Sequence, residues 1–548
     1  MPTVFAGSLV RANENARKHF ISSQILNMGE KFNKFLLYAR IIVDHIIDFF
    51  FSLYWDKRRK TIPDLDKKHA VLAESATSLA KKIRQKELKS EDLVKALIER
   101  IKQVNPLINA VAAERFDAAL AEAKEVDALI AAGLSEEEAK KKPYLGVPFT
   151  TKECQPVKGM PLTMGLWSRR REVANEDSTA IIYLKNAGAI PLASTNLPEL
   201  LVWQETRNPV YGMTKNPHHT GRSPGGSSGA EAALAASYAS PISLCSDIGG
   251  STRMPAFYCG MFGHHPTPGS NSIKGVLFRK EDCDSMLALG FISKHVEDLA
   301  PLTKILSGPM ADKLKLDRDV NIKDIKVYYT EASLDSFVSS IRPEMRNAMK
   351  RAVAKLTQEA TSSDKAPEPY YHKGFNYMYR LWNYWMSKEP DNYPVLYNNN
   401  KGEANAIVEL IKKILGQSNH YFFTILRLIE LKFIPLPEAE WAEKITKDLK
   451  EDLFGKLGDN GVLLFPSSPH VTPYHYSCLL RPYNFSYFAM VNTLKCPATQ
   501  VPMGKNEDGL PVGIQVLAAP YNDALCLAVA KYLEKEFGGA VMACSIKN

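Results

Sequence analysis

Residues 221–253 read GRSPGGSSGAEAALAASYASPISLCSDIGGSTR, in which two clusters of glycine and serine flank a helix-like stretch and an apolar run. Glycine lets backbone N–H groups approach a reacting oxygen closely, and serine hydroxyls can supply a nucleophile and proton carriers. The spacing matches neither the GxxxxGK[ST] phosphate loop nor the GxGxxG dinucleotide loop. The segment therefore predicts the active site of a serine hydrolase.

The first cluster also contains a G-x-S-x-G pattern centred on Ser227, which is typical of the nucleophile elbow of α/β-hydrolases. Under that alternative Ser227 would attack the substrate and would need an aspartate and a histidine further along the chain. A single Gly/Ser cluster can also be a flexible surface loop. Two clusters within so short a segment favour a functional site.

A third element, LGVPFTTKECQPVKGMPLTMG, begins upstream at Leu145. Its β-branched and apolar residues predict a strand that ends near Lys152, followed by a loop rich in glycine and proline. A lysine in such a position usually lies at the surface with its stem along apolar neighbours, so Lys152 alone decides nothing. Cys154 would follow on the same face, where packing is a more typical role than nucleophilic attack.

Lys152, SPGGSSG and DIGGSTR occur in this order, and with them the chain resembles the amidase signature family of serine hydrolases. The resemblance continues in EDSTAIIYLKNAGAIPLASTNLPEL, LGFISKHVEDLAPL, VLLFPSSP and CPATQVPMG followed by GLPVGIQV, and so covers about residues 70–545. Within the family, the N-terminal apolar segment and the HVEDL motif look most like the fatty-acid amide hydrolase 2 group.

The fold class predicted from the sequence is α/β, because apolar runs such as PYLGVPFT, PISLCS and GVLLFPS alternate with helical patterns. The family resemblance implies an α/β/α sandwich on one large mixed β-sheet. One helix is clear near the start of the core, since Leu93, Leu97, Ile101 and Val104 share a helical face. Pro106 is expected to end this helix.

The resemblance implies that Ser251 is the nucleophile, that Ser227 is a bridging serine next to a cis peptide bond, and that Lys152 is the base. The lysine must then be neutral, although deprotonating an ordinary lysine at pH 7 costs about 4.6 kcal/mol. Burial lowers that cost because a low dielectric disfavours the ammonium form. Ser227 can relay a proton from Ser251 to Lys152, so no histidine is needed.

The apolar run SPISLCSD is followed by a glycine turn, which predicts an oxyanion hole. Its donors are expected to be the backbone N–H groups of Ile248, Gly249, Gly250 and Ser251. By alignment of the motifs, Leu201 and Trp203 are expected to bind substrate beside the nucleophile.

Two aromatic and aliphatic runs cover residues 375–386 and 415–434. Helical spacing places Phe375, Met378, Trp382 and Trp385 on one face, which could either pack in the core or line a channel for an acyl chain. The sequence leaves both interpretations open.

The predicted reaction is hydrolysis of fatty-acid amides, and of lipid esters as further substrates, through an acyl-enzyme on Ser251. Three alternatives remain at this point. The protein could be an amidase of small soluble amides, an α/β-hydrolase-type esterase with Ser227 as nucleophile, or a catalytically silent lipid-binding homologue.

The net charge is +9, and residues 1–60 hold ten lysine or arginine residues against five acidic ones. Basic residues flank the apolar segment 35–55, which indicates contact with anionic lipid rather than with nucleic acid. The predicted organisation is a leader (1–30), a membrane-associating helix (31–60) and an amidase catalytic domain (61–548).

The apolar segment carries a polar stripe formed by Arg40, Asp44 and Asp48. Three such charges near the centre of a spanning helix would cost about 9 kcal/mol, which favours a helix lying in the membrane interface. A tilted transmembrane span is the second option, and a helix of the enzyme core is the third.

The eight cysteines are scattered, and neither a CxxC pair nor a metal-type His/Cys spacing occurs. We therefore expect no metal and no cofactor. Reduced thiols indicate an intracellular protein, here a membrane-associated one. The sequence leaves the oligomeric state open, a homodimer included.

Overall fold

The computed structural model describes residues 39–362 and 365–547, in which a β-sheet of 11 strands runs through the centre of the molecule. The predicted leader, residues 1–30, lies outside the described residues. The strand order is β1-β3-β2-β6-β8-β7-β12-β13-β11-β9-β10. The strands are β1 (Val111–Glu114), β2 (Pro148–Lys152), β3 (Ile190–Thr195), β6 (Ser243–Asp247), β7 (Phe262–His265), β8 (Ala288–Ser293), β9 (Lys326–Tyr329), β10 (Glu368–Pro369), β11 (Gly461–Pro466), β12 (Ala498–Lys505) and β13 (Pro511–Ala518).

The sheet is mixed. β2 pairs in parallel with both β3 and β6, and β9 pairs in parallel with β10 and β11. The strands from β6 through β8, β7, β12 and β13 to β11 are antiparallel neighbours. Most central strands are buried along their whole length, as expected of a sheet covered on both faces. The predicted α/β class and the large mixed sheet are confirmed.

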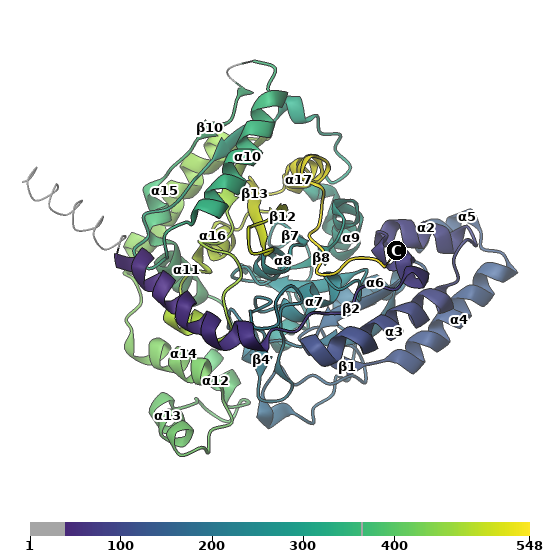
Figure 1. Ribbon diagram of the computed structural model, residues 1–548, viewed down its shortest axis with the longest axis horizontal. Coiled ribbons are helices and arrows are strands. Elements are labelled where there is room, and N and C mark those ends of the chain that lie inside the picture. The colour runs from purple at the N-terminus through teal and green to yellow at the C-terminus, as the bar shows by residue number, and fades with distance from the viewer. Residues whose placement is uncertain (1–38, 363–364, 548) are drawn as a thin grey trace, which may run out of the picture.

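Helices cover both faces of this sheet (Figure 1). They are α2 (Ala76–Arg84), α3 (Ser90–Ile108), α4 (Phe116–Ala132), α5 (Glu136–Lys141), α6 (Thr179–Asn186), α7 (Gly229–Ala235), α8 (Arg253–Cys259), α9 (Leu299–Ser307), α10 (Pro343–Glu359), α11 (Met378–Met386), α12 (Tyr393–Tyr397), α13 (Ala406–Ile414), α14 (Phe422–Phe433), α15 (Ala439–Leu457), α16 (Ser486–Leu494) and α17 (Asp523–Phe537). Helices α11 to α14 lie together at one side of the molecule (Figure 1).

The prediction that Pro106 ends its helix is wrong. Helix α3 runs through Pro106 to Ile108 and ends at Asn109, which has a left-handed conformation. Proline disrupts a helix most in the interior, whereas Pro106 lies in the last turn, where few further hydrogen bonds depend on it. The predicted apolar face is buried as expected.

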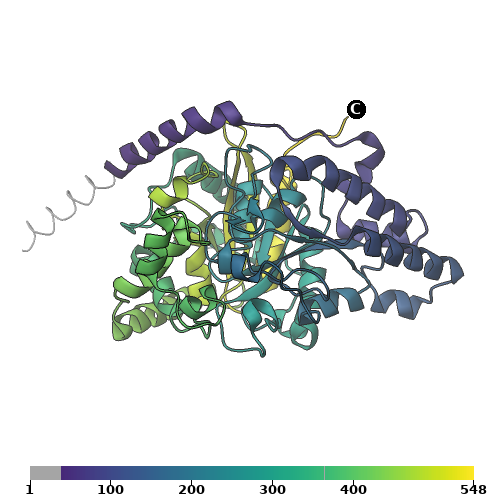
Figure 2. The ribbon, with the colours of Figure 1, turned by 90° about the horizontal axis from the view of Figure 1, so that it is seen from below.

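Residues 39–55 form a helix, called here the N-terminal helix, that extends along the outside of the molecule (Figure 2). Its polar stripe faces the protein rather than water. Asp44 is buried, and the Asp48 carboxylate accepts a 2.6 Å hydrogen bond from Arg481 and forms an ion pair with Arg342. The docked stripe explains how an apolar helix tolerates these charges.

The opposite side of the N-terminal helix is mainly apolar, and no other part of residues 39–362 and 365–547 buries it. Seven large side chains there are between 47% and 63% exposed: Ile42, Val43, Ile46, Phe49, Phe50, Leu53 and Tyr54. In the described part of the chain, every helix is too short or too polar to cross a bilayer.

Candidate active site

Lys152, Ser227 and Ser251 lie in three segments that meet around two parallel strands. Lys152 is the last residue of β2, as the sequence predicted, and Ser251 follows the end of the neighbouring strand β6. The Lys152 Nζ atom lies 2.5 Å from Ser227 Oγ and 3.1 Å from the hydroxyl of Ser246 on β6. The lysine side chain is completely buried.

Burial lowers the pKa of Lys152 below its ordinary value of 10.5, because removal of water penalises the ammonium form. The hydrogen-bond partners of its amine are hydroxyl groups rather than carboxylates. A neutral amine is therefore more accessible here than on a surface lysine.

Ser227 precedes α7 in a buried loop, and the peptide bond between Gly226 and Ser227 is cis. A nucleophile elbow requires a strand that leads directly into the serine. The preceding strand, β5 (Gly212–Met213), ends well before Ser227. The strand–serine–helix arrangement of an α/β-hydrolase is therefore missing around Ser227.

Ser251 lies in the wall of a cavity of about 330 Å³, together with Ile248, Gly249 and Gly226. Ser227 is not part of this wall, so the two serines differ in their access to a ligand. The backbone N–H of Ser228 donates a 3.2 Å hydrogen bond to the carbonyl oxygen of Ser251, which connects the two Gly/Ser clusters.

The four amides predicted for the oxyanion hole are not equivalent. The Gly250 N–H donates a 2.7 Å hydrogen bond to Asp247. This amide is therefore occupied, contrary to the prediction that it is free. The N–H groups of Ile248, Gly249 and Ser251 have no acceptor among residues 39–362 and 365–547. Those three remain available to a substrate oxygen.

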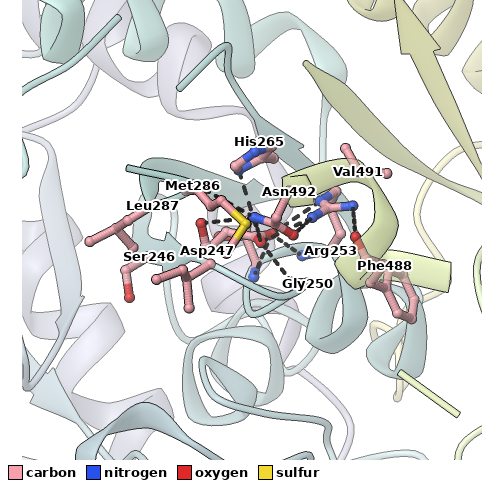
Figure 3. A network of polar contacts seen from close by, with 12 residues as sticks. Ser246, Asp247, Gly250, Arg253, His265, Met286, Leu287, Phe488, Val491 and Asn492 are labelled. Carbon is pink, nitrogen blue, oxygen red and sulfur yellow. Dashed lines mark hydrogen bonds and ion pairs between the residues drawn. The ribbon is translucent and has the colours of Figure 1, made fainter. Parts of the chain in front are cut away.

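A buried polar network around Asp247 and Arg253 supports the turn 248–251 that carries these amides (Figure 3). Asp247 accepts from the Thr252 N–H at 3.1 Å and pairs with Arg253 at 3.0 Å. Arg253 also donates to Asn492 and Gln515, each at 2.7 Å. Burial alone would raise the pKa of Asp247, but the Arg253 guanidinium holds it well below its ordinary value. Asp247 is therefore ionised, and it shapes the turn by accepting hydrogen bonds from the backbone N–H groups of Gly250 and Thr252.

Two aromatic side chains fix the same turn, and sequence reasoning did not assign either of them this role. Trp382 Nε1 donates a 3.0 Å hydrogen bond to the Ile248 carbonyl, and a Cβ atom at Gly249 would lie 3.1 Å from the Trp382 ring. A Cβ atom at Gly250, whose φ is +104°, would lie 2.2 Å from Phe488. Close packing and a positive φ thus require glycine at position 250, whereas a Cβ atom at position 249 would need the Trp382 ring to shift by a few tenths of an ångström.

Leu201 and Trp203 lie in the wall of the same cavity as Ser251. From α11, the wall receives Tyr379, Trp382 and Met386. Of the four residues for which the sequence left core and channel open, Trp382 lines the cavity, whereas Phe375, which precedes α11, and Met378 pack in the core and Trp385 donates to Thr446 on α15. The second run forms α14, which contributes Phe423, Leu426, Arg427, Ile429 and Glu430 to the wall. Each run thus contributes both to the core and to the cavity.

Among residues 39–362 and 365–547, no group of three or more His, Cys, Asp or Glu side chains is arranged to hold a metal ion. The cysteines in this part of the chain are all free. Cys154 is buried next to the site, and burial raises its pKa, so its thiol is a poor nucleophile.

Solved structures of two hydrolases share this fold. A solved structure of fatty acid amide hydrolase is 23% identical and covers 87% of each chain, with a TM-score of 0.65. A structure of 6-aminohexanoate cyclic dimer hydrolase complexed with substrate is 22% identical and covers 85% of this chain and 97% of that one, with a TM-score of 0.69.

The family model described as Amidase matches residues 92–527, and the chain belongs to the amidase signature family. Fatty-acid amide hydrolase 2 of Homo sapiens is 41% identical over 85% of this chain and 90% of the human protein. Fatty-acid amide hydrolase 2-B of Danio rerio is 38% identical over 94% of this chain and 99% of the fish protein. The protein is therefore an amidase, a hydrolase of amide bonds.

Proposed function

We propose that this amidase hydrolyses fatty-acid amides through an acyl-enzyme on Ser251, with Ser227 as proton relay and Lys152 as base. The observation that carries the proposal is the 2.5 Å contact between the buried Lys152 amine and Ser227, next to a serine that opens into an apolar cavity. A base without a charged partner can stay neutral and accept a proton.

In the first step, Ser251 Oγ attacks the carbonyl carbon of the substrate. The Ser251 proton passes to Ser227 Oγ while the Ser227 proton passes to the Lys152 amine. Ser227 thus remains a hydroxyl, and the Ser251 oxygen is bonded to the substrate carbon. The N–H groups of Ile248, Gly249 and Ser251 stabilise the oxyanion. The lysine then returns the proton through Ser227 to the leaving nitrogen, and the C–N bond breaks.

Water hydrolyses the acyl-enzyme in the second step. Lys152, now neutral again, takes a proton from the water through Ser227, and the attacking oxygen forms a second tetrahedral oxyanion in the same hole. Collapse of this intermediate breaks the C–O bond to Ser251 and releases the carboxylic acid, while Lys152 returns its proton through Ser227 to the Ser251 oxygen. The same groups thus act in both halves of the reaction, and an ester substrate would follow the same course.

A lipid acyl group is proposed because the cavity wall is mainly apolar and aromatic. Trp203 stacks on Phe423 with ring centroids 4.8 Å apart, and Trp382, Met386 and Leu426 add further apolar surface. Each methylene buried in such a wall contributes about 0.8 kcal/mol to binding. The names of the two relatives point to the same substrate class.

Steady-state kinetics with primary amides of graded acyl length test this proposal. We expect kcat/KM to rise by roughly fourfold for each added methylene until the cavity is filled, as about 0.8 kcal/mol per group implies. The Ser251→Ala variant serves as the blank for contaminating hydrolases. A preference for the shortest, water-soluble amides would contradict the lipid assignment and favour the small-amide alternative.

We also propose that the protein is intracellular and associates with a membrane through its N-terminal helix. Supporting observations are the exposed apolar side chains from Ile42 to Tyr54 and the basic residues 57–60 that follow them. Docking of Asp48 on the protein body favours a helix lying in the interface over a transmembrane span.

A further inference from the structure

Glu199 is a buried carboxylate outside the proposed catalytic groups. It is completely buried and accepts three hydrogen bonds from the segment that begins α14: from the Tyr421 N–H at 2.9 Å, from the Thr424 hydroxyl at 2.7 Å and from His420 Nδ1 at 2.7 Å. Burying a carboxylate is unfavourable unless donors surround it. The contacts therefore indicate a specific joint between two distant segments.

The joint connects two walls of the substrate cavity. Glu199 belongs to the same short turn as Leu201, and Trp203 follows two residues later, so the turn carries one wall. On the other side, α14 presents Phe423 and Leu426 to the cavity. The Trp203–Phe423 stack bridges the two walls directly beside the Glu199 contacts.

The backbone of the turn depends on such support. Leu200 and Leu201 have φ values of +49° and +68°, in the left-handed region that residues with a Cβ atom rarely occupy. Further along α14, Arg427 donates to Asn383 on α11 at 3.2 Å, so the helix has a second attachment. Loss of the Glu199 joint would loosen the first turn of α14 and leave its middle in place.

From these contacts we infer that Glu199 is a positioning residue for substrate selectivity: it sets the separation between the Leu201–Trp203 wall and α14. The inference rests on the proposed lipid substrate, because a displaced wall can change the chain-length preference only if the wild-type enzyme prefers long acyl chains. Glu199 is not part of the cavity wall and touches no catalytic group in the mechanism above. Its effect should therefore appear in KM for long acyl chains.

The experiment compares kcat and KM of the full-length wild-type, Glu199→Ala and Glu199→Gln proteins for one long-chain and one short-chain amide. For Glu199→Ala we expect the ratio of long-chain to short-chain kcat/KM to fall about tenfold, the size of effect that small changes in an apolar pocket have on selectivity. The change should lie mainly in KM. Glu199→Gln, which keeps an acceptor oxygen, should recover part of the ratio.

Ser75→Ala is the matched control, because Ser75 caps a different helix, α2, by accepting from the Ser78 N–H at 3.0 Å. It should leave the ratio unchanged. If Glu199→Ala does not fold, Thr424→Val removes one donor alone and should lower the ratio in the same direction.

An unchanged ratio in the folded variant, or an equal loss of kcat for both substrates, would overturn the inference. If the wild-type enzyme itself shows no preference for the long chain, the lipid proposal fails instead. The two failures are thus distinguishable in one set of measurements.

Discussion

Lys152 is the residue on which the proposed chemistry depends most. Lys152→Arg should be as damaging as Lys152→Ala, because a guanidinium stays charged and cannot accept the proton from Ser227. We expect both variants to lower kcat/KM for amides by about 100-fold or more, the usual contribution of a general base. Steady-state assays on folded variants measure this, and near-normal turnover of the arginine variant would contradict the role.

The pH dependence provides a second check on the same residue. Only the neutral amine can act as base, so kcat/KM should rise with pH as Lys152 loses its proton. Because burial lowers its pKa, the rise should be centred below the ordinary value of 10.5. This limb of the pH profile should be absent from the residual activity of Lys152→Ala.

At the residue scale, the sequence predicted Lys152, Ser227 and Ser251 only through their resemblance to a family. Local pattern could not tell a buried lysine from a surface one, since both follow an apolar strand. Trp382 and Glu199 acquire their roles from contacts with segments far away in the chain, such as Ile248 and Thr424. No spacing within the sequence could have indicated such contacts.

Secondary structure was more predictable at the scale of single elements. The strand before the oxyanion turn and the helix after the first Gly/Ser cluster both appear, as β6 and α7. The faces of helices were harder to assign. In α11, core and cavity both select large apolar side chains, so the periodicity alone could not decide which face meets the substrate.

The N-terminal helix shows a similar limit of sequence analysis. The sequence weighs its charged stripe only as a cost of insertion into a membrane, whereas Asp48 contacts Arg481 and Arg342 of the protein body. These partners of Asp48 lie more than 290 positions away in the chain, so a local sequence pattern could not predict them. The exposed apolar face follows from this docking.

Docking of this helix should depend on pH. Burial opposes ionisation of Asp48, but Arg481 and, more weakly, His470 and Arg342 lower its pKa from 3.8 to about 2. A depressed pKa means that the stabilisation is complete above pH 3.8 and is lost as the pH falls towards 2. Hydrogen exchange of residues 39–55, corrected for intrinsic rates, should therefore speed up as the pH falls from about 4 to about 2.

Asp48→Asn is the control for that measurement. It should raise exchange of the helix about tenfold at pH 7, because hydrogen bonds to charged groups typically contribute 1.5–3 kcal/mol. It should also remove the pH dependence. Equal protection in the variant and the wild type would mean that the Asp48 ion pairs do not hold the helix.

For the molecule as a whole, the exposed apolar face predicts how the enzyme meets a membrane. Replacing Phe49 and Phe50 by serine should weaken binding to phosphatidylserine-containing vesicles by at least about tenfold, since a buried aromatic side chain contributes roughly 1.5–3 kcal/mol. Hydrolysis of a short soluble amide measures whether the site is intact. Vesicle co-sedimentation measures the binding.

Ile182→Ser is a matched control, because Ile182 is exposed on a different helix, α6. It should bind vesicles like the wild type. High salt should release the wild-type protein in part by screening the basic residues 57–60. Undiminished binding of the double variant would exclude this face as the contact surface.

The identity of the acylated serine remains the most direct test of the proposed mechanism. The enzyme is reacted with a fluorophosphonate probe, and peptide mapping then locates the labelled serine. We predict that this serine is Ser251. Ser251→Ala should lose all labelling, and Ser227→Ala should be labelled more slowly but still on Ser251. A label on Ser227 in the wild-type enzyme would contradict the assignment of nucleophile and relay.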